Sequence, residues 1–108
     1  GVGVCEDADL AHAAARCVAG AFANAGQVCI SVQRVFVARQ RHAELLERIV
    51  AAAAALRIGD PDDEATDLGP MISEDAAGRV EAAVDAAVGG GAVAALRGRR
   101  LSPTLLGP

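Results

Sequence analysis

Apolar residues change their spacing several times along this chain, and the alternation restricts the folds that it can adopt. Segments with the three-to-four-residue spacing of helices lie at about 10–23, 41–56 and 73–88. Short Val-rich segments, which favour strands, lie at about 1–5, 31–38 and 92–96. The order strand, helix, strand, helix, helix, strand predicts an α/β fold with a mostly parallel sheet and flanking helices.

Polar residues and glycines mark the expected helix ends. Asp7 or Asp9 can cap the first helix and Ser73 the third, because a side-chain oxygen there accepts free backbone N–H groups. The glycines at 89–91 are expected to end the third helix rather than bind phosphate, since a phosphate site needs the N-terminal end of a helix. The expected inner face of the third helix consists of Ala76, Ala77, Val80, Ala83, Val84 and Ala87.

The composition limits the classes of partner. The chain has 108 residues and a formal net charge of −4, without a basic stripe for nucleic acid. Trp and Tyr are absent and there are two Phe, so no aromatic platform is expected to stack bases. No apolar run reaches the length of a membrane span. We expect a cytoplasmic protein with no nucleic-acid or membrane partner.

The two ends of the sequence bear on its domain organisation. Both ends read as the interior of strands, whereas the ends of a self-contained domain are usually polar and frayed. Alanine dominates the apolar residues and buries little area, so the core is expected to be thin. We therefore expect residues 1–108 to be one partial domain, truncated at both ends, that packs on the rest of a longer chain.

The cysteines are the main candidates for chemistry. Cys5, Cys17 and Cys29 lack the spacing of a zinc site, and no metal is expected. Cys17 falls on the apolar stripe of the first helix and is expected in the core. Cys29 follows the break in "FANAGQVCIS", where a glycine and Gln27 separate a helix from a strand. A lone cysteine is most often a buried structural residue, whereas a place at the end of an element favours function. From the residues alone both interpretations stand.

Other polar groups give weaker signals. His12 and His42 fall on helix surfaces and show no spacing that would activate a thiol. The basic turn at 97–100 is expected to be solvated. The acidic loop at 62–70 is expected to be a surface loop whose carboxylates do not form an acid–base pair.

The segment "FANAGQVCISVQRVFV", residues 22–37, closely resembles the active-site segment of the aldehyde dehydrogenase superfamily. Further motifs occur in the family's order: "EDADL" at 6–10, "LRIGDP" at 56–61, "TDLGPMIS" at 66–73 and "SPTLL" at 102–106. Essentially the whole chain therefore resembles a part of the family's catalytic domain. The wording "GQVCISVQR" looks most like the branch of lactaldehyde- and glyceraldehyde-type dehydrogenases.

The resemblance implies that Cys29 is the nucleophile of an NAD(P)+-dependent aldehyde dehydrogenase. Its thiolate would attack the aldehyde, hydride would pass to NAD+ or NADP+, and the thioester would be hydrolysed to the carboxylic acid. The resemblance also implies a substrate tunnel to which Phe22, Val28 and Ile30 contribute. A cofactor contact from Arg79 and a homo-oligomeric whole protein are further implications. Core packing for Phe22 and a solvated position for Arg79 are the alternatives.

Several parts of the family's machinery have no counterpart in these residues. In the family, the general-base glutamate and the nucleotide-binding domain precede this segment, and a glutamate–phenylalanine motif follows it. The 108 residues alone are therefore expected to lack dehydrogenase activity. A related enzyme that passes the thioester to coenzyme A is an alternative, as is a non-catalytic α/β interaction module whose cysteines are all in the core.

Overall fold

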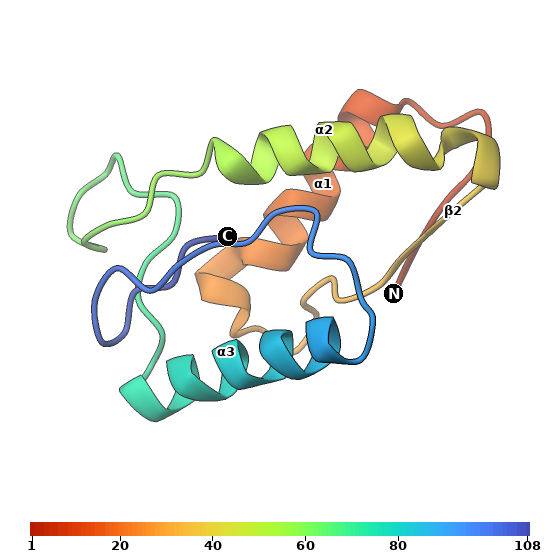
Figure 1. Cartoon of the computed structure of the whole chain (residues 1–108). Helices are drawn as coiled ribbons and strands as arrows, with labels where there is room; N and C mark the ends of the chain where they lie inside the picture. Colours follow the sequence, from red (N-terminus) through yellow and green to blue (C-terminus); the bar gives the residue numbers. More distant parts are fainter. The chain divides into compact units, whose positions relative to one another are not determined.

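The computed structural model describes all 108 residues, which divide into two compact units, Gly1–Leu56 and Arg57–Pro108. The first unit contains, in order, β1 (Val2–Val4), α1 (Leu10–Phe22), the 3-10 segment η1 (Ala23–Gly26), β2 (Val35–Val37), the 3-10 segment η2 (Arg39–Arg41) and α2 (His42–Ala54). The second unit contains α3 (Glu74–Gly89), as Figure 1 shows. None of the helices combines the length and the apolar character that crossing a bilayer requires.

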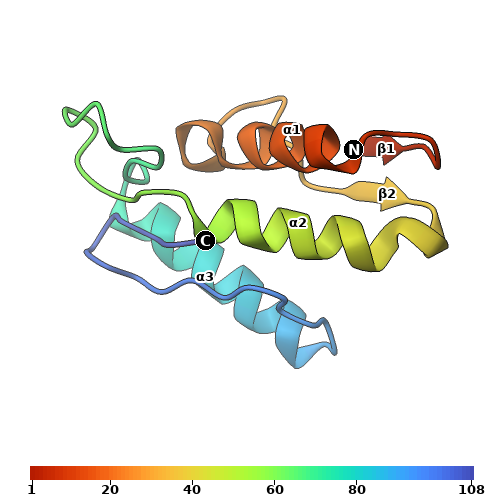
Figure 2. The same cartoon turned by 90° about the horizontal axis from the view of Figure 1, so that it is seen from above.

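The first unit is built on a parallel pair of strands. Val2 pairs with Val35, Gly3 with Phe36 and Val4 with Val37. Parallel strands need a crossover connection, and α1 provides it. Figure 2 shows β1 and β2 beside each other at the end of the unit where α1 and α2 begin. The predicted α/β class and the parallel pairing are confirmed, in a sheet of two strands.

The core of the first unit lies between one face of this sheet and the two helices. Its buried centre consists of Val4, Leu10, Ala14 and Leu45. Valines of both strands pack against this centre, whereas Phe36 on the other face of the sheet is 65% exposed. The alternation follows from the two-residue period of a strand, which turns successive side chains to opposite faces.

Asp9 fixes the start of α1. Its Oδ1 accepts hydrogen bonds from the backbone N–H groups of Ala11 (2.9 Å) and His12 (3.2 Å). The bonds from His12 and Ala11 hold the pKa of Asp9 below its ordinary value, because they stabilise the charged carboxylate. Asp7 and Asp9 were both predicted as possible caps of this helix, and Asp9 is the residue that caps it.

The α3 helix begins at its predicted cap, but its predicted inner face is only partly correct. Ser73 Oγ accepts the N–H of Ala76 at 3.1 Å. Ala76 and Ala77 are buried, as expected. Val80 and Val84 remain 42% and 41% exposed, so the prediction was wrong for the later turns. Arg97 and Arg100, in the loop that folds back onto α3, pair with carboxylates along the helix, while the two valines stay partly exposed.

Two predicted strands differ in the structure. Only Val35–Val37 of the segment 31–38 pairs as a strand, because the residues at its start bond to the end of α1 instead. The segment 92–96 forms no strand, and Val93 is 91% exposed. In the second unit, ladder pairing is limited to the isolated bridges Ile58–Leu68 and Arg100–Leu106. A strand needs a partner, and glycines on both sides of 92–96 favour a loop.

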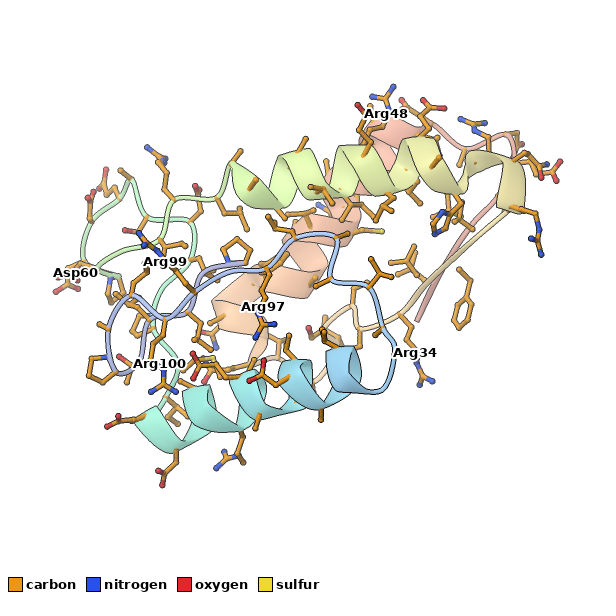
Figure 3. All side chains as sticks on the ribbon, viewed as in Figure 1. Arg34, Arg48, Asp60, Arg97, Arg99 and Arg100 are labelled. Atoms are coloured by element: carbon orange, nitrogen blue, oxygen red, sulfur yellow. The ribbon has the colours of Figure 1, made fainter.

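The basic turn at 97–100 is tied to α3 rather than solvated throughout. Arg100 pairs with Glu81 at 2.6 Å and with Glu74 at 3.6 Å, and its side chain is only 27% exposed. Arg97 pairs with Asp85 while staying 54% exposed. Figure 3 shows both arginines directed toward α3. The prediction of a solvated turn was wrong for Arg100.

Replacing Leu45 by Ala tests the core of the first unit. Leu45 is 2% exposed, so Leu45→Ala should lower the free energy of unfolding by about 2–5 kcal/mol through lost burial and a cavity. Leu46, its neighbour on α2, is 39% exposed. Leu46→Ala should therefore change the denaturation midpoint far less, and equal effects in urea unfolding would contradict the assigned core.

The Asp9 cap predicts a pH-dependent contribution to stability. Asp9→Ala should lower the free energy of unfolding near neutral pH, because two N–H groups lose their acceptor. Since folding lowers the pKa of Asp9 below 3.8, its contribution is full above that value and is lost as the pH falls through the folded pKa. Urea unfolding should show a difference at about pH 7 that shrinks at about pH 2.

The matched variant Asp9→Asn separates the cap from its charge. Asn caps helices about as well as Asp, so this variant should keep most of the stability near neutral pH. It should also lose the dependence on acid. A difference between Asp9→Ala and wild type that stays constant with pH would refute the electrostatic part of the explanation.

Candidate active site

Residues that follow Cys29 in the sequence cap the C-terminal end of α1. The N–H of Val32 donates to the carbonyl oxygen of Gly20 at 3.1 Å. Ser31 Oγ donates to the carbonyl oxygen of Ala21 at 3.3 Å. The last carbonyl groups of a helix lack partners within the helix, so these bonds satisfy two of them. They also draw residues 23–32 into a closed loop, which we call the cysteine loop.

Gly20 permits this closure because it has no side chain. A Cβ atom built at position 20 would lie 2.8 Å from Val32 Cγ2, closer than real Cβ contacts come. Val32 therefore sits directly against the last turn of α1. The chain then continues from Val32 into β2.

Three successive residues near the start of the cysteine loop adopt the left-handed region. The φ angles are 50° at Asn24, 55° at Ala25 and 73° at Gly26. Glycine adopts this region freely and Asn tolerates it, whereas Ala is strained there. The N–H and Nε2 of Gln27 both donate to the carbonyl oxygen of Asn24, at 3.0 and 3.1 Å. The predicted break at 24–27 is thus a turn with its own hydrogen bonds.

Cys29 lies at a corner of the next turn. The N–H of Ser31 donates to the carbonyl oxygen of Val28 at 3.0 Å, which makes Cys29 and Ile30 the central residues of a β-turn. Cys29 is a free, exposed thiol. None of the backbone hydrogen bonds of the loop uses the Cys29 N–H. The interpretation of Cys29 as a buried structural residue does not fit this position.

The apolar residues predicted to line a tunnel differ in how far they are exposed. Phe22 is the last residue of α1 and is half-buried, as is Val28 in the loop. Ile30, next to Cys29 in the turn, is 83% exposed. The part played by these three side chains at a substrate remains a prediction.

The other two cysteines differ from Cys29. Cys17 is 5% exposed, and burial raises the pKa of its thiol, so the protonated and unreactive form is favoured. Its predicted place in the core is confirmed. Cys5 is exposed just after β1. Both line a cavity of about 260 Å³ between β1 and α1, with mostly apolar walls that do not include Cys29.

Arg79 lies in the second unit, on the exposed surface of α3. It borders an open depression of about 550 Å³ together with Glu74, Asp75, Gly78, Ala82 and Arg100. Two carboxylates at this rim would repel the diphosphate of a dinucleotide, and Arg100 is already paired with Glu74. These residues therefore do not fit NAD or NADP on their own. No group of three or more His, Cys, Asp or Glu side chains is placed to hold a metal ion.

Sequence reasoning missed how the loop is closed. The sequence Asn-Ala-Gly could have predicted the left-handed turn, because Asn and Gly are the residues that best tolerate left-handed backbone. The contact of Gly20 with Val32 could not be predicted in this way, since the two residues are distant in sequence and lie in elements of different type.

Comparison with known proteins shows a match to one family over nearly the whole chain. The profile of the aldehyde dehydrogenase family matches residues 2–106. A lactaldehyde dehydrogenase from Methanococcus aeolicus is 37% identical over 107 residues, which are 95% of this chain and 23% of that protein. A succinate-semialdehyde dehydrogenase [NADP(+)] from Mycobacterium leprae is 41% identical over 97 residues, with 90% of this chain and 21% of that protein covered. The chain thus spans about a fifth of the length of these relatives.

A solved structure shows the same likeness in three dimensions. The NADP complex of a glyceraldehyde-3-phosphate dehydrogenase from Methanocaldococcus jannaschii matches with a TM-score of 0.87 and 36% identity, over 99% of this chain and 23% of that one. Lactaldehyde and glyceraldehyde-type enzymes thus both occur among the matches, as the resemblance implied. Because the family profile matches residues 2–106, the chain belongs to the aldehyde dehydrogenase family.

Proposed function

We propose that residues 1–108 carry the nucleophile of an NAD(P)+-dependent aldehyde dehydrogenase, and that this nucleophile is Cys29. One observation carries the proposal: Cys29 is an exposed thiol at the corner of a β-turn, in a loop that hydrogen bonds hold closed. Catalytic groups are often carried on such loops, positioned by a rigid scaffold. The family match over residues 2–106 supports the same reaction class.

The geometry of the turn suits attack on a carbonyl group. The thiolate of Cys29 forms a bond to the aldehyde carbon, and the electron pair of the carbonyl bond moves onto oxygen. The Cys29 N–H, which donates to no backbone carbonyl, can donate to this oxyanion. Because sulfur and N–H belong to one residue, the backbone of the turn sets their relative position.

The oxyanion then re-forms the carbonyl group while the hydrogen on the same carbon leaves as hydride, which produces a thioester on Cys29. This step needs a hydride acceptor, and the next one needs water. NAD+ or NADP+ is the acceptor that we propose, bound mainly by parts of the whole protein other than residues 1–108. Hydrolysis of the thioester on Cys29 releases a carboxylic acid and restores the thiol. A solved relative binds NADP, which supports the choice of cofactor class.

The surroundings of the nucleophile complete the proposal. Phe22, Val28 and Ile30 contribute apolar surface to the aldehyde's path, and the substrate belongs to the lactaldehyde or glyceraldehyde type. Arg79 contributes one contact to the cofactor in the assembled protein. The 108 residues are part of a larger catalytic domain in a cytoplasmic homo-oligomer and lack activity alone.

Replacing the nucleophile tests the function directly. In the full-length protein that carries these residues, Cys29→Ser should lower aldehyde-dependent reduction of NAD(P)+ by on the order of 10³-fold or more. Cys5, which is also exposed, offers a matched control, and Cys5→Ser should retain the activity. Equal activity of Cys29→Ser and wild type would refute the proposal. Reduction that requires added coenzyme A would instead identify the acylating alternative.

Alkylation of the three thiols provides an independent measurement. With iodoacetamide and peptide mass mapping, Cys29 should react fastest in the native full-length protein, because it is exposed and is the proposed nucleophile. Cys5 should react at an ordinary rate. Cys17 should react only after unfolding, since it is buried and its pKa is raised. A Cys29 rate no faster than that of Cys5 would argue against an activated thiol.

A further inference from the structure

We propose that the amide side chains of Asn24 and Gln27 form a pair that positions Cys29, an inference that rests on the proposed role of Cys29 as nucleophile. Each side-chain amide donates a hydrogen bond to the backbone carbonyl of the other residue. We assign both as positioning residues, which act on the reaction through the backbone of the cysteine loop.

The turn that this pair closes is one that an unsupported chain avoids. Three successive residues, from Asn24 to Gly26, have positive φ. At Ala25 this conformation brings Cβ close to the following carbonyl oxygen. An alanine-rich segment prefers to continue as a right-handed helix, which would carry Cys29 away from the end of α1. The left-handed run therefore needs specific interactions to hold it.

The two amides supply these interactions. Gln27 Nε2 and the Gln27 N–H converge on the carbonyl oxygen of Asn24, at 3.1 and 3.0 Å. A carbonyl oxygen has two lone pairs and can accept both bonds. In return, Asn24 Nδ2 donates to the carbonyl oxygen of Gln27 at 3.4 Å, a longer and weaker bond. The bonds in both directions fix the peptide group from which the next turn begins.

The other end of the loop is fixed as well. Ser31 and Val32 bond to the last carbonyl groups of α1, so they cannot follow a movement of residue 27. Between the two anchors lie Val28, Cys29 and Ile30. A shift at Gln27 must therefore be taken up by these three residues, and it moves the sulfur and the N–H of Cys29. A displacement of about 1 Å at a reacting group can reduce a rate by on the order of 10²-fold.

Substitutions of nearly equal size test the pair in the full-length protein. Gln27→Met removes the donor without adding charge, whereas Gln27→Glu and Asn24→Asp replace a donor by an acceptor. Each should lower kcat by roughly 10- to 100-fold and leave the KM for NAD(P)+ unchanged. Gln33 is an exposed amide just beyond the second anchor. The matched control Gln33→Glu adds the same charge and should behave as wild type.

Two further measurements separate positioning from other effects. The double variant Asn24→Asp/Gln27→Glu should be no worse than the worse single variant, because both act on one turn. The alkylation rate of Cys29 should change in the three single variants but not in Gln33→Glu. Cys17 should stay unreactive throughout, which shows that the core remains closed.

The outcomes distinguish this inference from the function on which it rests. A wild-type kcat and an unchanged Cys29 alkylation rate in Gln27→Met would refute the proposal that Asn24 and Gln27 position Cys29. Additive losses of kcat in the double variant would refute it as well. If Cys29→Ser keeps full activity while Gln27→Met still alters Cys29 alkylation, the nucleophile assignment fails. The positional link between the pair and Cys29 would then stand.

Discussion

The contact between Gly20 and Val32 determines the path of the chain through the first unit. The Val32 N–H bonds to the Gly20 carbonyl, and the missing side chain at position 20 lets Val32 approach the helix. This contact ends α1, closes the cysteine loop and directs the chain toward β2. The pairing of β2 with β1, and hence the core between the sheet and the helices, follows from that direction. The helix, the loop and the sheet therefore all depend on the absence of a side chain at position 20.

The same closure explains how an exposed thiol can have a defined position. Surface loops are usually mobile, and a nucleophile on a mobile loop would rarely meet its substrate in the right geometry. Here one end of the loop donates a hydrogen bond to a carbonyl group of α1. At the other end, a hydrogen bond within the loop closes its left-handed turn. Cys29 stays accessible because it occupies the corner of a turn, while its backbone is fixed through Ser31.

The parts of this structure that could be predicted from sequence are the local ones. The three helices and the caps Asp9 and Ser73 follow from side-chain spacing and from chemistry within a few residues. Strands also depend on partners that are distant in sequence. The segments 31–34 and 92–96 have the composition of strands but find no such partner, so they do not form strands. Cys29 was selected through its motif, and its role remains a prediction. The bonds that hold its loop were not foreseen, because they join residues of different elements.

The sheet itself has a consequence for handling the isolated chain. Two strands leave both edges of the sheet without partners, and a pair of this kind is marginally stable by itself. Each open edge is a template for a further strand, and Phe36 adds an exposed apolar ring on one face. In a concentrated solution of the 108 residues, strands of other copies can pair with the same edges, and this pairing favours aggregation.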